Sequence, residues 1–143
     1  MEPRSPERIL VQQGLLIFLA GLLMGAFTQA VANPRMMMGA HTGTLLTGTF
    51  LVALSSAWKH LTISDRNTRL TLWLLIGGSW GVSVALVFAA MFATSRSTPI
   101  MGAGHSGAAW AEAVADISLT ISSIAVLLAA VNVVRAVYAR PAE

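Results

Sequence analysis

The sequence contains no cysteine, and this absence excludes several kinds of chemistry. Without a thiol the chain cannot form a disulfide, use a thiolate nucleophile, bind an iron–sulfur cluster or attach a c-type haem covalently. Charge is also scarce, because only 10% of the 143 residues are Asp, Glu, Lys or Arg, whereas a soluble domain carries about 25%. No basic stripe interleaved with aromatic residues is present, and so no nucleic-acid partner is predicted.

Apolar residues make up 55% of the chain. A chain this short cannot bury so much apolar surface in its own interior, because small domains have a large surface for their volume. Lipid must therefore replace water as the solvent. Four stretches reach the roughly 20 residues that a membrane-spanning helix needs, namely 9–31, 36–58, 70–93 and 110–137. The sequence predicts a single all-α membrane domain over residues 1–143, with four transmembrane helices in a bundle.

Basic residues are unevenly divided between the two sides of the predicted bundle. Seven fall at the N-terminus, in the second loop and at the C-terminus: Arg4, Arg8, Lys59, Arg66, Arg69, Arg135 and Arg140. Arg35 and Arg96 fall on the other side. Because cytoplasmic loops are enriched in Lys and Arg, both termini are predicted to be cytoplasmic, in a multi-pass protein of a bacterial-type inner membrane.

The connections between the spans differ in character. ANPR, residues 32–35, is a tight-turn signal that predicts a hairpin of the first two helices. The second loop is polar, and Ser64 or Asp65 is able to cap the third helix. The third connection, residues 94–109, is long and rich in glycine and small residues, and loops of this kind are often functional.

Glycines recur within the spans, at Gly21 and Gly25, at Gly39 and Gly43, and in the run GGSWG of residues 77–81. In a membrane, small residues at such spacings let two helix backbones approach closely. Helix packing within one subunit explains these glycines. A homo-oligomer is also predicted, because four thin helices expose much glycine-bearing surface.

A histidine lies inside the second span, in GAHTG at residues 39–43. Ionisable groups inside a membrane are costly and therefore suggest function. His41 has two interpretations: a neutral imidazole hydrogen-bonded to a neighbouring helix, or a metal ligand, above all to haem iron. At helical spacing Thr44 and Gly48 share its face, and that shallow face suits a flat ligand. Haem needs one axial histidine, whereas a closed zinc site needs several N or S ligands.

Other polar residues are candidates for proton transfer or substrate contact. His105 in the third loop is interpreted as a second ligand, a proton donor or a plain loop residue. Glu112 and Asp116 are four apart on one helix face, where one carboxyl of a close pair is able to hold a proton. Thr47 could face a cavity, although back-bonding to the helix is the usual role of such a threonine. Trp80, between glycines, is either a packing plug or a pocket wall.

Three blocks, NPRMMMGAH, GTFLVALSSAW and STPIMGAGHSGAAWAEA, resemble hydroxylaminobenzene mutase, an integral membrane enzyme that converts hydroxylaminobenzene to 2-aminophenol. The resemblance runs from about residue 14 to residue 137. AHTGTLLTG, with the WG of Trp80 and Gly81, is more distantly similar to styrene oxide isomerase, a haem b protein of four-helix subunits. This similarity implies that His41 is the axial ligand, with Gly43 and Gly48 leaving space for the macrocycle and Thr44 beside it.

The resemblance implies a membrane isomerase that acts on a small aromatic arylhydroxylamine, with haem iron as a Lewis acid, in the degradation of aromatic compounds. It also implies a homo-oligomer, with a trimer favoured. His105, Glu112 or Asp116 would carry protons, and Thr47 and Trp80 would contact the substrate. No nucleotide-binding glycine loop is present, in agreement with a reaction that needs no net electrons.

Three alternatives remain open at the level of sequence. Epoxide isomerisation is one, although Thr47 and Leu86 occupy the positions where styrene oxide isomerase has an asparagine and a tyrosine. An electron-transfer cytochrome with both His41 and His105 on the iron is another. A small drug transporter is the last, but spans one to three lack the buried acidic residue that it would require.

Overall fold

The computed structural model describes residues 5–139, which form four long helices and three short helical segments. The long helices are α1 (Pro6–Ala26), α2 (Pro34–Ala57), α3 (Asp65–Met91) and α5 (Ala109–Tyr138). The short segments are the 3-10 turns η1 (Thr28–Ala30) and η2 (Trp58–His60) and the single turn α4 (Pro99–Gly102). All four long helices are long and apolar enough to cross a membrane, which confirms the predicted fold class.

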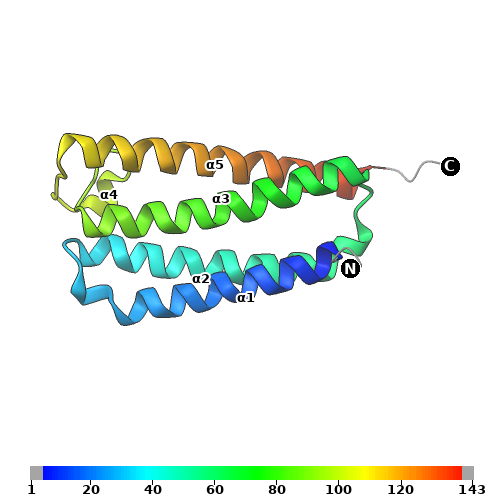
Figure 1. The fold of residues 1–143 in the computed structure, drawn as a ribbon, viewed down its shortest axis with the longest axis horizontal. Coiled ribbons are helices and arrows are strands. Elements are labelled where there is room, and N and C mark those ends of the chain that lie inside the picture. The colour runs from blue at the N-terminus through cyan, green and yellow to red at the C-terminus, as the bar shows by residue number, and fades with distance from the viewer. Residues whose placement is uncertain (1–4, 140–143) are drawn as a thin grey trace.

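The long helices run side by side along one axis, as two hairpins (Figure 1). α1 packs mainly on α2, α3 packs mainly on α5, and α2 joins the two pairs by contacting α3. α1 begins and α5 ends at the same end of the molecule, which we call the terminal end. The opposite end, called the loop end, holds residues 94–108 and the turn between α1 and α2. Arg4 and Arg140, used in the prediction of orientation, lie outside the described residues.

Local hydrogen bonds set the helix boundaries and account for one difference from the prediction. α1 ends at Ala26, five residues before the predicted boundary, because η1 follows and the Thr28 hydroxyl donates to the Gly25 carbonyl at 2.9 Å. Asn33 caps α2 by accepting from the Met36 N–H at 3.0 Å. Ser64 occupies the N-cap of α3, but its side chain makes no capping hydrogen bond.

Glycine lets the helices of each hairpin approach to backbone contact. A Cβ at Gly48 would lie 2.6 Å from the Phe18 nitrogen and 2.7 Å from the Gly14 oxygen, both on α1. Gly78 approaches the backbone of α5 in the same way, and a Cβ at Gly81 would meet the Ser122 side chain of α5. The predicted role of glycine in packing within the subunit is confirmed for Gly78 and Gly81, whereas Gly48, expected on an open face, packs against α1 instead.

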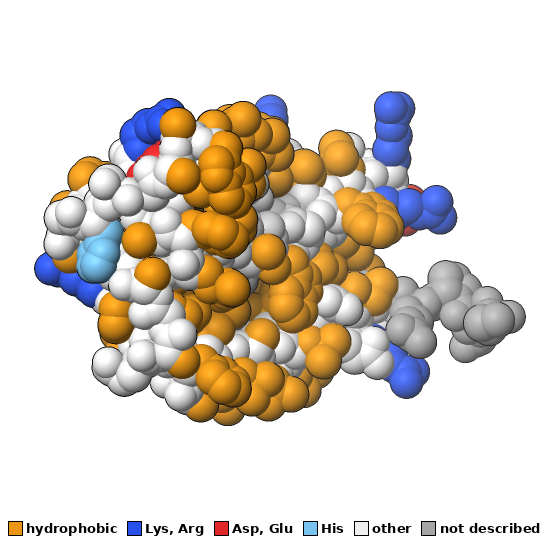
Figure 2. Space-filling model, turned by 60° about the vertical axis from the view of Figure 1, so that its left-hand side comes forward, with side chains coloured by type: hydrophobic (Ala, Val, Ile, Leu, Met, Phe, Trp, Pro, Cys, Tyr) orange, Lys and Arg blue, Asp and Glu red, His pale blue; other side chains and the backbone are white. Residues whose placement is uncertain are grey.

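Two apolar clusters fill the interior, one toward each end. Between them lies a layer of small and polar residues, where the Thr44 hydroxyl of α2 donates to the Ser83 hydroxyl of α3 at 3.1 Å. The terminal-end cluster is Leu10, Ile17, Leu51, Leu54, Trp58, Leu72, Leu75, Ala129 and Val133. The loop-end cluster is Met36, Met37, Ala40, Ala89, Ala90 and Ala115. On the face shown in Figure 2, apolar side chains cover the length of the bundle, and Lys and Arg lie mainly toward the two ends.

Replacing Gly48 by alanine is expected to destabilise the α1–α2 hairpin by about 1–3 kcal/mol, the usual cost of overpacking. The matched control is Gly77→Ala, because a Cβ at Gly77 meets nothing within 4 Å. Both substitutions gain the same helix propensity, so the difference in thermal unfolding in detergent reports packing alone. Equal melting temperatures for the two variants would contradict the close backbone contact.

Candidate functional site

The imidazole of His41 is held by α1. Its Nδ1 lies 2.8 Å from the carbonyl oxygen of Gly21. A carbonyl can only accept a hydrogen bond, so Nδ1 carries a proton, and in the neutral ring Nε2 then keeps an unshared electron pair. A Cβ at Gly25 would lie 2.8 Å from both Nδ1 and Cε1 of the ring, so that glycine gives the ring its place against α1.

This geometry combines the two sequence interpretations of His41. The predicted hydrogen bond to a neighbouring helix is present, and it leaves the other ring nitrogen in the form that binds metals. In metal sites, a histidine usually donates its second N–H to a carbonyl or carboxylate, which fixes the tautomer and the ring orientation. His41 is half-buried, and Met38 and Thr42 beside it are exposed, so the imidazole borders the outer surface of the hairpin.

The predicted shallow face around His41 is wrong, because α1 and α3 cover it. Thr44 is 1% exposed and its hydroxyl is bound to Ser83. Gly48 is pressed against the backbone of α1. Gly43 does border open space, but two residues past His41 it lies about 200° round the helix, away from the imidazole.

Thr47 and Trp80, the predicted substrate contacts, already have hydrogen-bond partners. The Thr47 hydroxyl donates to the Gly43 carbonyl at 2.9 Å, as back-bonding predicts. The Trp80 indole N–H donates to the Gln13 side-chain oxygen at 3.0 Å, linking α3 to α1. Gln13 precedes Gly21 by eight residues, so the indole nitrogen lies roughly 12 Å along α1 from the His41 contact, toward the terminal end.

Glu112 organises the loop end. It is 6% exposed, and its carboxylate accepts from the Ser95 N–H at 3.0 Å and 3.1 Å, the Arg96 N–H at 3.0 Å and the Gly107 N–H at 2.9 Å. A carboxylate surrounded by backbone donors is stabilised in its charged form. The sequence could not show this anchoring role, because the donors lie on two separate parts of the loop.

Asp116 has partners of its own, although Arg96 contacts both acids. It accepts from the Ser97 hydroxyl and pairs with the Arg96 guanidinium at 3.2 Å. The expected pair of coupled carboxylates is therefore wrong, since each acid is balanced by separate donors. The Asp116 side chain is 22% exposed, so it is the more accessible of the two acids.

Asn33 is a site residue that the sequence signalled only as part of a turn. Besides capping α2, its amide donates to the carbonyls of Met101 at 3.1 Å and Gly102 at 3.2 Å. Its backbone N–H donates to the Ala90 carbonyl at 3.0 Å. One buried residue, through its side chain and its backbone, thus ties the first turn, the end of α3 and the third loop together. His105 lies on an exposed part of that loop.

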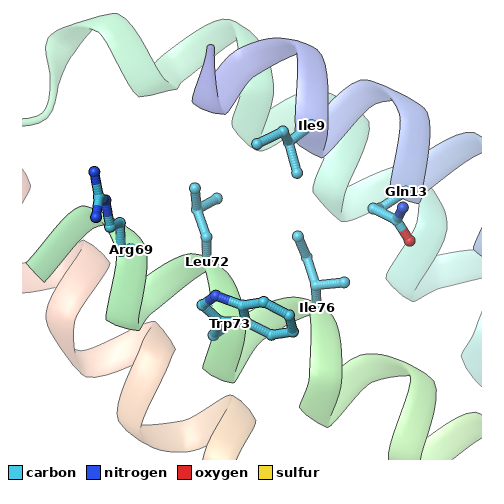
Figure 3. Close-up of a pocket in the computed structure, with 6 residues that line it drawn as sticks. All are labelled: Ile9, Gln13, Arg69, Leu72, Trp73 and Ile76. Atoms are coloured by element: carbon cyan, nitrogen blue, oxygen red, sulfur yellow. The ribbon is translucent and has the colours of Figure 1, made fainter. Parts of the chain in front are cut away.

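The predicted site residues form two separate groups. His41 belongs to the α1–α2 hairpin, whereas Glu112 and Asp116 belong to α5, which packs on α3. An apolar groove of about 530 Å³ lies at the loop end between α1, α2 and α3, and it includes Met24 and Met37, neighbours of Gly25 and His41 along their helices. A second groove of about 430 Å³ lies at the terminal end, where Gln13, Arg69 and Trp73 line it (Figure 3).

Replacing Glu112 by glutamine is expected to loosen the third loop, because an amide keeps the size but loses the charge and places N–H groups toward N–H donors. Trypsin should then cleave after Arg96 about tenfold faster than in the wild type, since cleavage follows the open population. Glu7→Gln, on the first turn of α1 at the terminal end, is the control. Unchanged cleavage after Arg96 would show that Glu112 does not hold the loop.

Comparison with known proteins agrees with the resemblance seen in the sequence blocks. The family model described as styrene oxide isomerase matches residues 6–138. The hydroxylaminobenzene mutase HabB of Ectopseudomonas oleovorans is 34% identical over 137 residues, which cover 93% of this chain and 84% of the relative. HabA of the same organism is 30% identical over 100 residues, covering 69% and 74%. The chain therefore belongs to the styrene oxide isomerase family and is an isomerase of the membrane.

Proposed function

We propose that this protein converts an arylhydroxylamine into the corresponding 2-aminophenol. The N–O bond breaks, a C–O bond forms at the ortho carbon, one proton leaves that carbon and the nitrogen gains one. Substrate and product are isomers, so no electron donor is required. Two relatives that carry the name hydroxylaminobenzene mutase support this choice of reaction over epoxide isomerisation.

The observation that carries the proposal is the bond between His41 Nδ1 and the Gly21 carbonyl, because it leaves Nε2 available as a single ligand. Among the described residues no three His, Cys, Asp or Glu side chains are grouped as a metal site. One fixed imidazole at an accessible edge suits haem b better than zinc. When bound, haem would supply a Lewis-acidic ferric iron that polarises the substrate oxygen.

The chain's own groups would position the substrate and move the protons. The apolar groove beside Met24 and Met37 is open to the outside, so an aromatic substrate dissolved in lipid can reach it. Asp116 is our choice for the proton carrier, with His105 as the second candidate. Glu112 is assigned the anchoring of the loop, because N–H donors occupy both of its oxygens. Thr47 and Trp80 remain proposed substrate contacts, and a homo-oligomer remains the proposed assembly.

His41→Ala is expected to abolish both the Soret band and the formation of 2-aminophenol from hydroxylaminobenzene, because the axial nitrogen is lost. His105→Ala is the matched control and should keep the band. Absorption spectra of the detergent-purified proteins and chromatography of the product measure the two effects. Loss of the band in His105→Ala as well, with low-spin iron unresponsive to substrate, would instead identify an electron-transfer cytochrome with two histidine ligands.

Gly25→Ala is expected to move the His41 imidazole without removing it, since the new methyl group would lie 2.8 Å from two ring atoms. Misplacement of a catalytic group by about 1 Å lowers activity roughly 100-fold, and the Soret maximum should shift as well. Gly77→Ala, which adds the same methyl group where nothing lies within 4 Å, is the control. A wild-type spectrum and turnover in Gly25→Ala would disprove the positioning of His41 by α1.

A further inference from the structure

We propose that a polar cavity at the terminal end binds a phosphate group. The cavity has a volume of about 370 Å³ and lies between the loop that follows α2, the first turns of α3 and the last turns of α5. It is distant in sequence from His41 and from the loop-end acids. Its polar lining consists of Thr62, Ser64, Asn67, Thr71, Asn132 and Arg135.

Within the described part of the chain, the hydroxyl of Thr71 is buried without a hydrogen-bond partner. Thr71 is 0% exposed, yet its hydroxyl oxygen has no hydrogen-bond partner among residues 5–139. Other threonines of the long helices donate to the carbonyl four residues earlier, as Thr42, Thr47 and Thr49 do. A buried hydroxyl without a partner is rare and calls for an explanation. Because Thr71 lines the cavity, a bound acceptor would supply the missing bond.

Within residues 5–139, the Ser64 side chain makes no capping hydrogen bond to the first N–H groups of α3. Ser64 is at the N-cap without a side-chain capping bond, so the first N–H groups of a 27-residue helix have no cap from that residue. Such a terminus favours anions, through both the free N–H groups and the helix dipole. Ser64 and Asn67, from this terminus, line the same cavity as Thr71.

Arg135 supplies a full positive charge at the cavity. It lies in the last turn of α5, and within the described part of the chain the one salt bridge joins Arg96 and Asp116 instead. The dipole of α5 alone would explain a cation at this position. It does not explain why an uncapped helix start and an unpaired buried hydroxyl line the same space. A phosphate group carries several oxygens that can accept from groups of all three kinds, and arginine is well suited to bind it.

The cavity is formed by contacts within the chain. The Thr62 N–H donates to the Ala136 carbonyl at 3.2 Å, which holds the loop against α5 and satisfies one of the last carbonyls of that helix. A volume of about 370 Å³ is far more than the roughly 10–15 Å³ that a single water needs. The cavity lies where α3 begins and α5 ends, at the depth expected for lipid headgroups, so the phosphate belongs to a lipid headgroup or to a free anion.

The test uses the full chain in dodecyl maltoside, a detergent without phosphorus, and measures binding by phosphorus NMR. The probes are inorganic phosphate and the short-chain lipid dihexanoyl phosphatidylglycerol. Arg135→Gln is expected to weaken binding by about tenfold or more, because a charge-assisted bond is lost. Thr71→Val, which keeps the side-chain shape, should weaken it by about threefold to tenfold. It serves as the second variant if Arg135→Gln does not fold.

Arg66→Gln is the matched control, because it removes the same charge at the same end from a residue outside the cavity lining, and it should change binding by less than about twofold. Stronger binding of the lipid probe than of inorganic phosphate identifies a headgroup site, and equal binding identifies a site for the free anion. The proposal is overturned if neither probe binds the wild type, if Thr71→Val binds as the wild type does, or if Arg66→Gln loses as much affinity as Arg135→Gln.

Discussion

The close backbone contact between α1 and α2 is the constraint on which the candidate site depends. Gly14 and Gly48 allow the contact, and two turns further along α1 the Gly21 carbonyl lies within hydrogen-bond distance of His41. With larger residues at these glycines the helices would separate, and the imidazole would lose both its orientation and its preferred tautomer. In lipid there is no water to replace that bond, so helix packing and imidazole chemistry are set by the same contact.

At the loop end, few charged side chains are available to pair with buried backbone groups. Residues 94–108 carry many backbone N–H and C=O groups next to the apolar cluster of Met36, Met37 and Ala90, and each buried group needs a partner. Glu112 accepts from three N–H groups and Asn33 donates to two carbonyls. One acid and one amide thus order a loop that lacks long secondary structure, which explains why a glycine-rich segment can keep a defined shape.

The sequence predicted the four spans well, because apolar length depends on the bilayer and not on tertiary contacts. It predicted less of the site. The sequence predicted a hydrogen bond from His41 to a neighbouring helix. It did not identify the partner, because a backbone carbonyl carries no sequence signal. Thr44 and Gly48 were assigned to an open face, since helical spacing shows which residues share a face and not which helix covers it. Glu112 was interpreted as a proton carrier. Its anchoring role was missed because its donors are backbone N–H groups, which give no signal in the sequence.

The separation of His41 from Asp116 bears on how the reaction is organised. An isomerisation that moves one hydroxyl within one molecule needs a single group to polarise the N–O bond and a route for one proton from carbon to nitrogen. In the proposed reaction these two tasks are assigned to groups on different helix pairs. α2 touches α3 through Thr44 and Ser83, so the hairpin that orients the imidazole is fixed to the hairpin that carries the acids. A shift of either hairpin would change the distance between the two groups, so under the proposed function the contact between Thr44 and Ser83 would influence activity without touching the substrate.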